Sequence, residues 1–181
     1  MGKLYTVLGL MSGTSMDGVD ASIIKSDGER VYLALFDKYF EYGDKIRQKI
    51  LDIRAKILVP DHLIKHESEI KDIEREITLF HSNVVKEILN NNKIDVDLLG
   101  FHGQTIFHDS KKKITKQLGD GKLLSQLTKK KVVYNFRQND LKNGGQGAPL
   151  TPIFHNLIAN KYLKEKLDES YSVNFVNIGG I

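Results

Sequence analysis

The amino-acid sequence predicts an α/β domain in which helices flank a mixed β-sheet. Two apolar, strand-like runs enclose a glycine-rich loop near the N-terminus, and a long segment with helical periodicity follows them. Farther along the chain, short apolar runs occur together with helical segments. The chain has 181 residues, of which 40% are hydrophobic and 28% are charged, as is ordinary for a globular protein. This length is sufficient for one compact domain and the edge of another.

The first half of the chain predicts three neighbouring strands followed by two helices. An Asp27-Gly28 pair marks the turn before the third strand, which is rich in aromatic and aliphatic residues. Pro60 separates the two helices, and the second one carries apolar residues at every third or fourth position, as amphipathic core helices do. The strands are expected at 4–11, 21–25 and 31–39, and the helices at 44–57 and 61–90.

The second half predicts further strands and helices and then a domain boundary. A charged segment at 164–170 separates the last helix from a new strand. We therefore expect a first domain at 1–164 and, at 165–181, a linker with the first strand of a truncated second domain. The strands are expected at 96–102, 114–118, 132–136 and 172–178, and the helices at 123–128 and 150–163.

The loop between the first two strands, within Gly9–Asp20, has the composition of a phosphate site. Its glycines allow the backbone to approach a ligand closely, and successive main-chain N–H groups can form an anion-binding concavity. Asp17 and Asp20 would repel a bare phosphate, but they fit a divalent cation that lies between them and the phosphate. The loop therefore predicts a site for the phosphate tail of a metal–nucleotide complex. The alternative is a glycine-rich surface turn whose Asp and Ser side chains satisfy local backbone groups.

Two common phosphate motifs are excluded by their spacing. A P-loop requires Lys directly after its last glycine, but Val19 follows Gly18. The dinucleotide motif Gly-x-Gly-x-x-Gly is absent as well, because Gly145-Gln146-Gly147 lacks the third glycine. Strands on both sides of the loop indicate instead the hairpin phosphate loop of the actin-like ATPase and sugar kinase architecture, which is a ribonuclease H-like fold.

Two further groups of polar residues follow predicted strands. His102 and Gln104 come directly after a buried strand, where open α/β sheets bind their ligands, so they predict contact with a sugar or a phosphate. For His102 alone, the alternative is a buried histidine with satisfied hydrogen bonds. Arg137 and Asp140 lie at the entrance of the glycine-rich segment 143–149, where a guanidinium suits a carboxylate or phosphate of the substrate.

The composition excludes several classes of site and partner. The chain has no cysteine, which excludes disulfides, thiolate zinc sites and a cysteine nucleophile and is compatible with a cytoplasmic location. No apolar run is long enough to span a membrane, and the N-terminus lacks the plan of a signal peptide. The net charge is +4, but the lysine clusters at 111–113 and 129–131 contain no aromatic residues, so we expect solvated lysines and no nucleic-acid partner.

Taken together, these motifs resemble the anhydro-N-acetylmuramic acid kinase family. The resemblance implies an actin-like, two-domain kinase that uses ATP and water to open the 1,6-anhydro ring and to phosphorylate O6, giving N-acetylmuramic acid 6-phosphate. It also implies a role in the recycling of cell-wall sugars in the bacterial cytoplasm. The resembling segments run in family order over nearly the whole chain: Gly9–Asp20, Gly100–His108, Gln117–Gly119, Phe136–Arg137, Asp140, Gly144–Leu150 and Val176–Gly180.

The resemblance further implies the ligand-binding residues, with ATP and Mg²⁺ as cofactors. Asp17 and Asp20 would orient Mg²⁺ through water. The partners would be the amino sugar, ATP and, for assembly, a second copy of the chain or a complementing C-terminal half. The sugar-facing residues would be His102, Gln104, Arg137 and Asp140. The ATP-binding residues would be Gly13, Thr14, Ser15, Met16, Asp17, Gly18, Val19 and Asp20.

The sequence departs from the family pattern in two ways. Asn135 lies where relatives usually have Asp, so this position supplies no charge. The family's catalytic base, an Asp in a Phe-Asp-x-Gly-Pro-Gly-Asn segment, would follow Ile181, so no catalytic residue is expected within this chain. Such a base contributes about 10²–10⁴-fold in rate. The chain therefore resembles an N-terminal half. The alternative to a kinase half is a catalytically inactive remnant, or half of a split enzyme, that acts as an interaction module.

Overall fold

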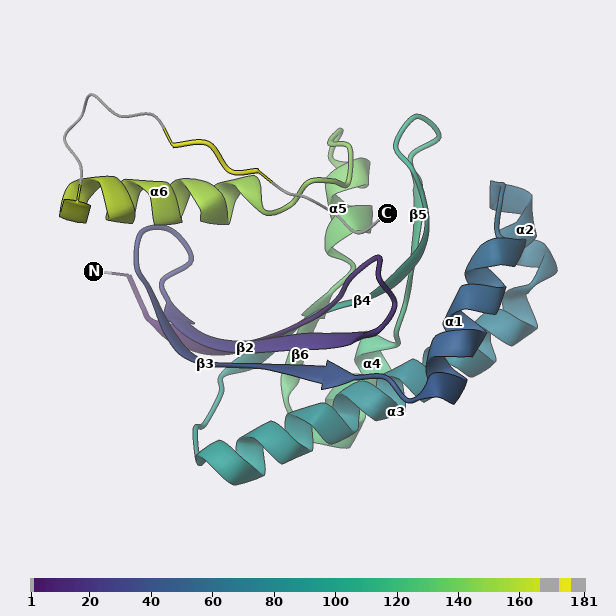
Figure 1. Cartoon of the computed structure of the whole chain (residues 1–181), viewed down its shortest axis with the longest axis horizontal. Coiled ribbons are helices and arrows are strands. Elements are labelled where there is room, and N and C mark those ends of the chain that lie inside the picture. Colours follow the sequence, from purple (N-terminus) through teal and green to yellow (C-terminus); the bar gives the residue numbers. More distant parts are fainter. Residues whose placement is uncertain (1, 167–172, 177–181) are drawn as a thin grey trace.

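The structure of the 181-residue chain is a computed structural model that describes residues 2–166 and 173–176 (Figure 1). Its strands are β1 (Tyr5–Ser12), β2 (Gly18–Ser26), β3 (Tyr32–Glu41), β4 (Leu98–Asp109), β5 (Ile114–Leu118) and β6 (Lys131–Tyr134). Its helices are α1 (Asp44–Lys56), α2 (Pro60–Lys65), α3 (Glu67–Asn92), α4 (Gly121–Thr128), α5 (Phe136–Lys142) and α6 (Pro152–Lys166).

Within the described residues, the strands form one mixed sheet of six strands in the order β3-β2-β1-β4-β5, with β6 also paired to β4. β1, β2 and β3 are an antiparallel meander, whereas β1 and β4 are parallel neighbours. β4 changes partner along its length: Leu98–Phe101 pair in parallel with β6, and Gln104–Asp109 pair in antiparallel with β5. The predicted mixed sheet is therefore confirmed, and the change of partner falls at His102 and Gly103.

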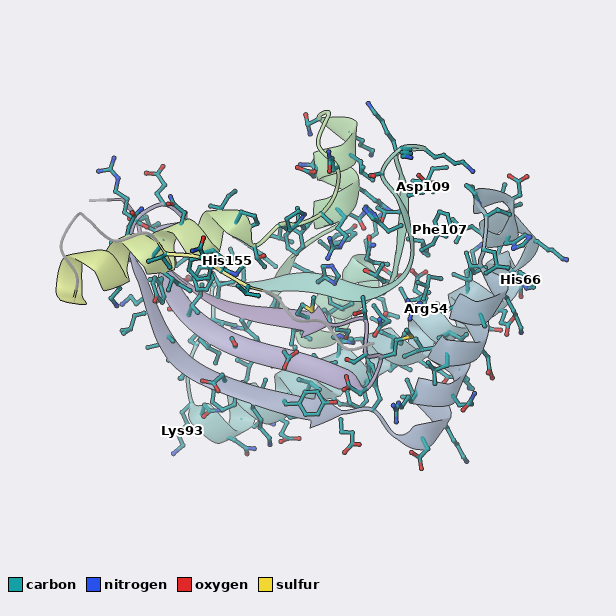
Figure 2. All side chains as sticks on the ribbon, turned by 45° about the horizontal axis from the view of Figure 1, so that its top comes forward. Arg54, His66, Lys93, Phe107, Asp109 and His155 are labelled. Carbon is teal, nitrogen blue, oxygen red and sulfur yellow. The ribbon has the colours of Figure 1, made fainter. Side chains whose placement is uncertain are left out.

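Helices α1, α3 and α4 lie on one side of the sheet, and α6 lies on the other side (Figures 1 and 2). The core on the first side joins alternate strand residues to the apolar face of α3. Burying an aliphatic side chain contributes roughly 1.5–3 kcal/mol, so this face holds α3 on the sheet. The core includes Leu8, Leu10, Ile23 and Leu99 of the strands and Ile73, Ile77 and Val85 of α3.

The prediction of a single helix at 61–90 is wrong, because the structure divides this segment at His66 into α2 and α3. The backbone of His66 leaves the helical region, with φ of −106° and ψ of 21°. The ring of His62, within α2, lies 2.8 Å from the carbonyl oxygen of Lys56 and bonds α2 to the end of α1. The direction of α3 is set instead by its apolar face, so the two helices meet at a bend.

The predicted strand 96–102 is too short, because β4 continues through His102 and Gln104 to Asp109. Gly103 has a φ of +73°, which favours glycine, and the register between β1 and β4 shifts next to it. This irregularity allows β4 to exchange β6 for β5 as its neighbour without ending. His102 and Gln104 therefore lie inside a strand and not beyond its end.

Residues 137–140, which were expected at the entrance of a glycine-rich segment and in no helix, form part of α5. The chain turns from β6 into α5 at Asn135, whose φ of 62° is in the left-handed region that Asn tolerates better than most residues. The functional consequence is that Arg137 and Asp140 lie on a helix with defined side-chain directions.

The end of the chain is described only in part. The predicted strand 172–178 is absent from its described part, 173–176, and the rest of it lies outside the described residues. Helix α6 extends to Lys166, and the remaining residues of the expected segment 165–181 also lie outside. Within residues 2–166 and 173–176, no helix is both long and apolar enough to cross a membrane.

Candidate functional site

The loop between β1 and β2, residues 13–17, lies beside the part of β4 that changes partner. Hydrogen bonds from Gln104 to Gly13 and from Arg137 to His102 join this loop, β4 and α5. Next to α5 the surface is hollowed by a pocket of about 980 Å³, a volume typical of small-molecule sites. Residues that line the pocket include Met11, His102, Val133, Asn135, Arg137, Asp140 and Ala148–Thr151.

Met16 fixes the conformation of the loop. Its side chain is 1% exposed and lies in the core, with its Sδ 4.0 Å from Nη1 of Arg54, a residue labelled in Figure 2. Burial of this side chain offsets the cost, about 1–2 kcal/mol, of its left-handed backbone, which has a φ of 56°. Met16 N–H donates to the carbonyl oxygen of Gly13 at 3.3 Å and closes the turn. Met16 can therefore offer a ligand only its main chain.

Thr14 and Ser15 are exposed at the tip of the loop. Their main-chain N–H groups donate to no acceptor among the described residues. The tip therefore presents two hydroxyls and two available N–H groups to a ligand.

The carboxylate of Asp17 is hydrogen-bonded within the loop. Ser15 Oγ donates to Asp17 Oδ1 at 2.5 Å, and this bond lowers the pKa of Asp17, which is ionised at neutral pH. The phenol of Tyr39 lies beside it, and the pKa of Tyr39 is raised by burial and by the charges of Asp17 and Asp20. Asp20 is exposed on β2, so both carboxylates lie near the same phenol. Within the described ranges, no group of three His, Cys, Asp or Glu side chains could hold a metal ion by itself.

Gly18 and Val19 shape the start of β2 below the loop. A Cβ atom at Gly18 would lie 2.6 Å from the ring of Tyr39, so the absence of a side chain allows the phenol to approach Asp17. Val19 is buried in the core. Its side chain is therefore inaccessible to a ligand.

Gln104 was expected to face the sugar, but it is fully buried and does not line the pocket. Its Nε2 donates to the carbonyl oxygen of Gly13 at 2.8 Å, which ties the start of the loop to β4. The expectation fails because β4 continues as a strand, which places this side chain under the loop instead of at an open strand end. Its Oε1 has no hydrogen-bond partner among the described residues.

His102, Arg137 and Asp140 lie together at the wall of the pocket. Arg137 Nε donates to His102 Nε2 at 2.8 Å, and Arg137 Nη1 donates to the carbonyl oxygen of Gly147 at 2.8 Å. Asp140 Oδ2 accepts a bond from Gly147 N–H at 2.7 Å. Arg137 and Asp140 thus hold both polar groups of Gly147 and position the second glycine-rich loop over the pocket.

The ring of His102 is neutral and has one defined tautomer. Its Nδ1 lies 2.7 Å from the carbonyl oxygen of Gly103 and donates to it, which leaves Nε2 to accept from Arg137. Burial is the main cause that lowers the pKa of His102, and the positive charge of Arg137 lowers it further. His102 therefore acts here as an acceptor that orients the guanidinium.

Sequence reasoning missed three buried polar residues below the loop: Ser12, Tyr42 and His81. Ser12 Oγ lies 2.8 Å from the Tyr42 hydroxyl and 3.4 Å from His81 Nε2. Burial lowers the pKa of His81 to about 4 and raises that of Tyr42. His81 lies four residues from both Ile77 and Val85, which belong to the apolar face of α3. This spacing in the sequence indicates that His81 is buried.

A mixed sheet with a hairpin loop at the ends of β1 and β2, together with a pocket next to α5, is consistent with a domain of the actin-like ATPase and sugar kinase class. Comparison with known proteins agrees with this class. The family model described as anhydro-N-acetylmuramic acid kinase matches residues 5–181. The chain therefore belongs to the anhydro-N-acetylmuramic acid kinase family.

Curated relatives named anhydro-N-acetylmuramic acid kinase are similar over the whole chain. A protein from Pelagibacter ubique (strain HTCC1062) is 59% identical over 181 residues, which cover 100% of this chain and 47% of the relative. A protein from Agrobacterium fabrum is 40% identical over 190 residues, covering 100% of this chain and 48% of the relative. The chain thus spans about half the length of the curated relatives it matches.

Proposed function

We propose that this chain supplies the phosphate-binding loop and the sugar pocket of an anhydro-N-acetylmuramic acid kinase. The reaction is the ATP-dependent hydrolytic opening of 1,6-anhydro-N-acetylmuramic acid with phosphorylation at O6, which gives N-acetylmuramic acid 6-phosphate. The process is the recycling of cell-wall sugars in the cytoplasm. The observation that carries the proposal is the 13–17 loop, tied to β4 beside a pocket that His102, Arg137 and Asp140 line.

The tip of the loop fits the phosphate tail of ATP together with Mg²⁺. The N–H groups of Thr14 and Ser15, which have no acceptor among the described residues, can donate to phosphate oxygens. Mg²⁺ keeps several waters and binds through one or two carboxylates together with phosphates, and Asp17 and Asp20 provide such a pair. When bound, Mg²⁺ would neutralise the charge that develops on the transferred phosphoryl group.

The pocket beside α5 fits an acidic amino sugar. Arg137 uses Nε and Nη1 within the protein, and Nη2 donates to no acceptor among the described residues. This nitrogen is therefore available to the carboxylate of a muramic sugar. Asp140 uses Oδ2 for Gly147, which leaves Oδ1 to accept from a sugar hydroxyl or amide.

We expect the catalytic base of the proposed reaction in the part of the relatives that this chain does not match. A second candidate function follows from the half-length match to the relatives. In that case the chain is an inactive interaction module that binds a second copy or a complementing C-terminal half.

The proposal is tested by mixing this chain with the part of the Pelagibacter ubique relative that it does not match. Mass spectrometry then measures formation of the 6-phosphate from the anhydro sugar, ATP and Mg²⁺. We expect product from the mixture and none from this chain alone. If the full-length relative is active and the mixture is not, the proposal of a kinase half fails. Binding of the two halves without product would then support the interaction module.

A further inference from the structure

Three polar side chains from distant parts of the sequence form one buried row under the 13–17 loop. Ser12 ends β1, Tyr42 follows β3, and His81 lies in the middle of α3. Their exposed fractions are 1%, 2% and 0%. Buried polar groups destabilise a fold unless they are hydrogen-bonded, so this row has to be complete to be tolerated.

The hydrogen bonds of the row have one consistent direction. His81 Nδ1 lies 2.8 Å from the carbonyl oxygen of Ile77, so Nδ1 carries the hydrogen and donates. His81 Nε2 must then accept, and Ser12 Oγ donates to it at 3.4 Å. Because the single hydroxyl hydrogen of Ser12 is used, the Tyr42 phenol donates to Ser12 Oγ at 2.8 Å. The low pKa of His81 agrees with this neutral ring.

Both ends of the loop depend on this row. Ser12 directly precedes Gly13, where the loop begins, and Tyr42 N–H donates to the carbonyl oxygen of Asp17 at 2.7 Å, where the loop ends. Gln104 adds a separate bond to Gly13. We propose that His81 is a positioning residue that fixes both ends of the 13–17 loop through Ser12 and Tyr42. The identity of the loop's ligand rests on the proposed function, whereas the effect of His81 on the loop does not.

Hydrogen bonding and packing by His81 can be separated by substitution. The His81 ring packs edge-on against Phe101 at 4.9 Å between ring centroids, so a phenylalanine retains an aromatic contact but removes the acceptor for Ser12. His81→Gln restores an acceptor oxygen on a side chain of similar reach. Ser82→Ala is the matched control, because Ser82 is the next residue of α3, is 1% exposed, and has no hydrogen-bond partner among the described residues.

The test is hydrogen exchange of the Met16 and Tyr42 amides, which donate to the carbonyl oxygens of Gly13 and Asp17 at the two ends of the loop, in the full 181-residue chain, together with Mg-ATP binding. We expect His81→Phe to speed exchange of these amides about tenfold and to weaken Mg-ATP binding by a similar factor, in line with the loss of one net hydrogen bond. His81→Gln should recover most of both effects. Ser82→Ala should leave the exchange of the loop unchanged.

Unchanged loop exchange in His81→Phe, with only a lower melting temperature, would overturn the proposal and leave His81 a core residue. Should that variant fail to fold, Ser12→Ala removes the same bond from the other side, and unchanged exchange in it would overturn the proposal as well. If the parent chain does not bind Mg-ATP but His81→Phe still frees the loop, the positioning role is supported and the nucleotide assignment of the loop is contradicted.

Discussion

Arg137 Nε donates a hydrogen bond to Nε2 of His102 at 2.8 Å, and this bond joins α5 to β4. The same guanidinium donates from Nη1 to the carbonyl oxygen of Gly147. One planar side chain therefore connects a strand, a helix and a glycine-rich loop at the edge of the pocket.

Replacing Arg137 by Lys should weaken binding of the anhydro sugar at least tenfold. A single ammonium group cannot make both bonds in the same geometry, and a hydrogen bond to a charged group contributes about 1.5–3 kcal/mol. Calorimetric titration of the sugar measures the change. Arg30→Lys, on the turn between β2 and β3, is the control and should bind as the parent does. Equal affinities for parent and Arg137→Lys would show that the guanidinium does not bind the sugar.

Asp17→Asn should weaken Mg-ATP binding about tenfold while it changes the melting temperature little. Asp17 is half-buried, and the side chain that donates to its carboxylate, Ser15, is exposed at the tip of the same loop. Asp37→Asn removes the same charge from exposed β3 and serves as the control. Titration of Mg-ATP into the three proteins decides the matter. Equal affinities of the parent and Asp17→Asn for Mg-ATP would show that the loop is a simple turn without a role in nucleotide binding.

The stability of the fold should fall in mild acid because of His81. Burial holds its pKa near 4, below the 6.5 of an unperturbed histidine. Between these values the unfolded chain binds more protons, so the free energy of unfolding decreases as the pH falls. The contribution of the neutral His81 ring to the free energy of unfolding is fully present above about pH 6.5 and is lost toward pH 4. In total it is on the order of 3 kcal/mol.

Urea unfolding at pH 7 and at pH 5 measures this dependence. His81→Gln has no titrating group at this position, so its two unfolding free energies should differ less than those of the parent. The same pH dependence in both proteins would assign the acid sensitivity to other groups.

Asp27 should stabilise the turn between β2 and β3 without affecting ligand binding. Main-chain N–H groups of Val31, Arg30 and Glu29 donate to its Oδ1 and lower its pKa from 3.8 to about 2. Its stabilising effect is therefore present above about pH 4 and is lost as the pH falls through 2. Asp27→Ala should lower the melting temperature clearly at pH 7 and much less near pH 2. Reduced Mg-ATP binding by this variant would contradict a purely local role.

The sequence was sufficient to locate the first three strands and the hairpin loop, because alternation and glycine content depend on neighbouring residues. It was not sufficient for the length of β4, because that length depends on pairing with β5 and on the backbone of Gly103. The helix α5 was missed because seven residues are too few to form a stable helix on their own. Its hydrogen bonds to β4 and to Gly147 are tertiary and cannot be read from local sequence.

The residues of the candidate site could likewise be predicted only where the signal lies in neighbouring residues. Arg137 and Asp140, which line the pocket, could be proposed from the sequence because charged residues next to a glycine-rich segment are informative in themselves. Gln104 was assigned to the wrong surroundings, because its burial follows from the continuation of β4. His81 has a local signal in its helical spacing, but its partner Ser12 lies 69 residues away, and no local pattern connects them.

The parallel pairing of β1 with β4 has a consequence for the order of folding. The β1–β2–β3 meander consists of local contacts, but its loop is fixed by His81 and Gln104, at sequence separations of 69 and 91 residues. Contacts over such separations form late, because closing a long segment of chain has to precede them. During synthesis the hairpin can therefore form early, while its tip acquires a fixed shape only after β4 has docked. A fixed conformation of the 13–17 loop is thus a property of the finished sheet and not of the hairpin alone.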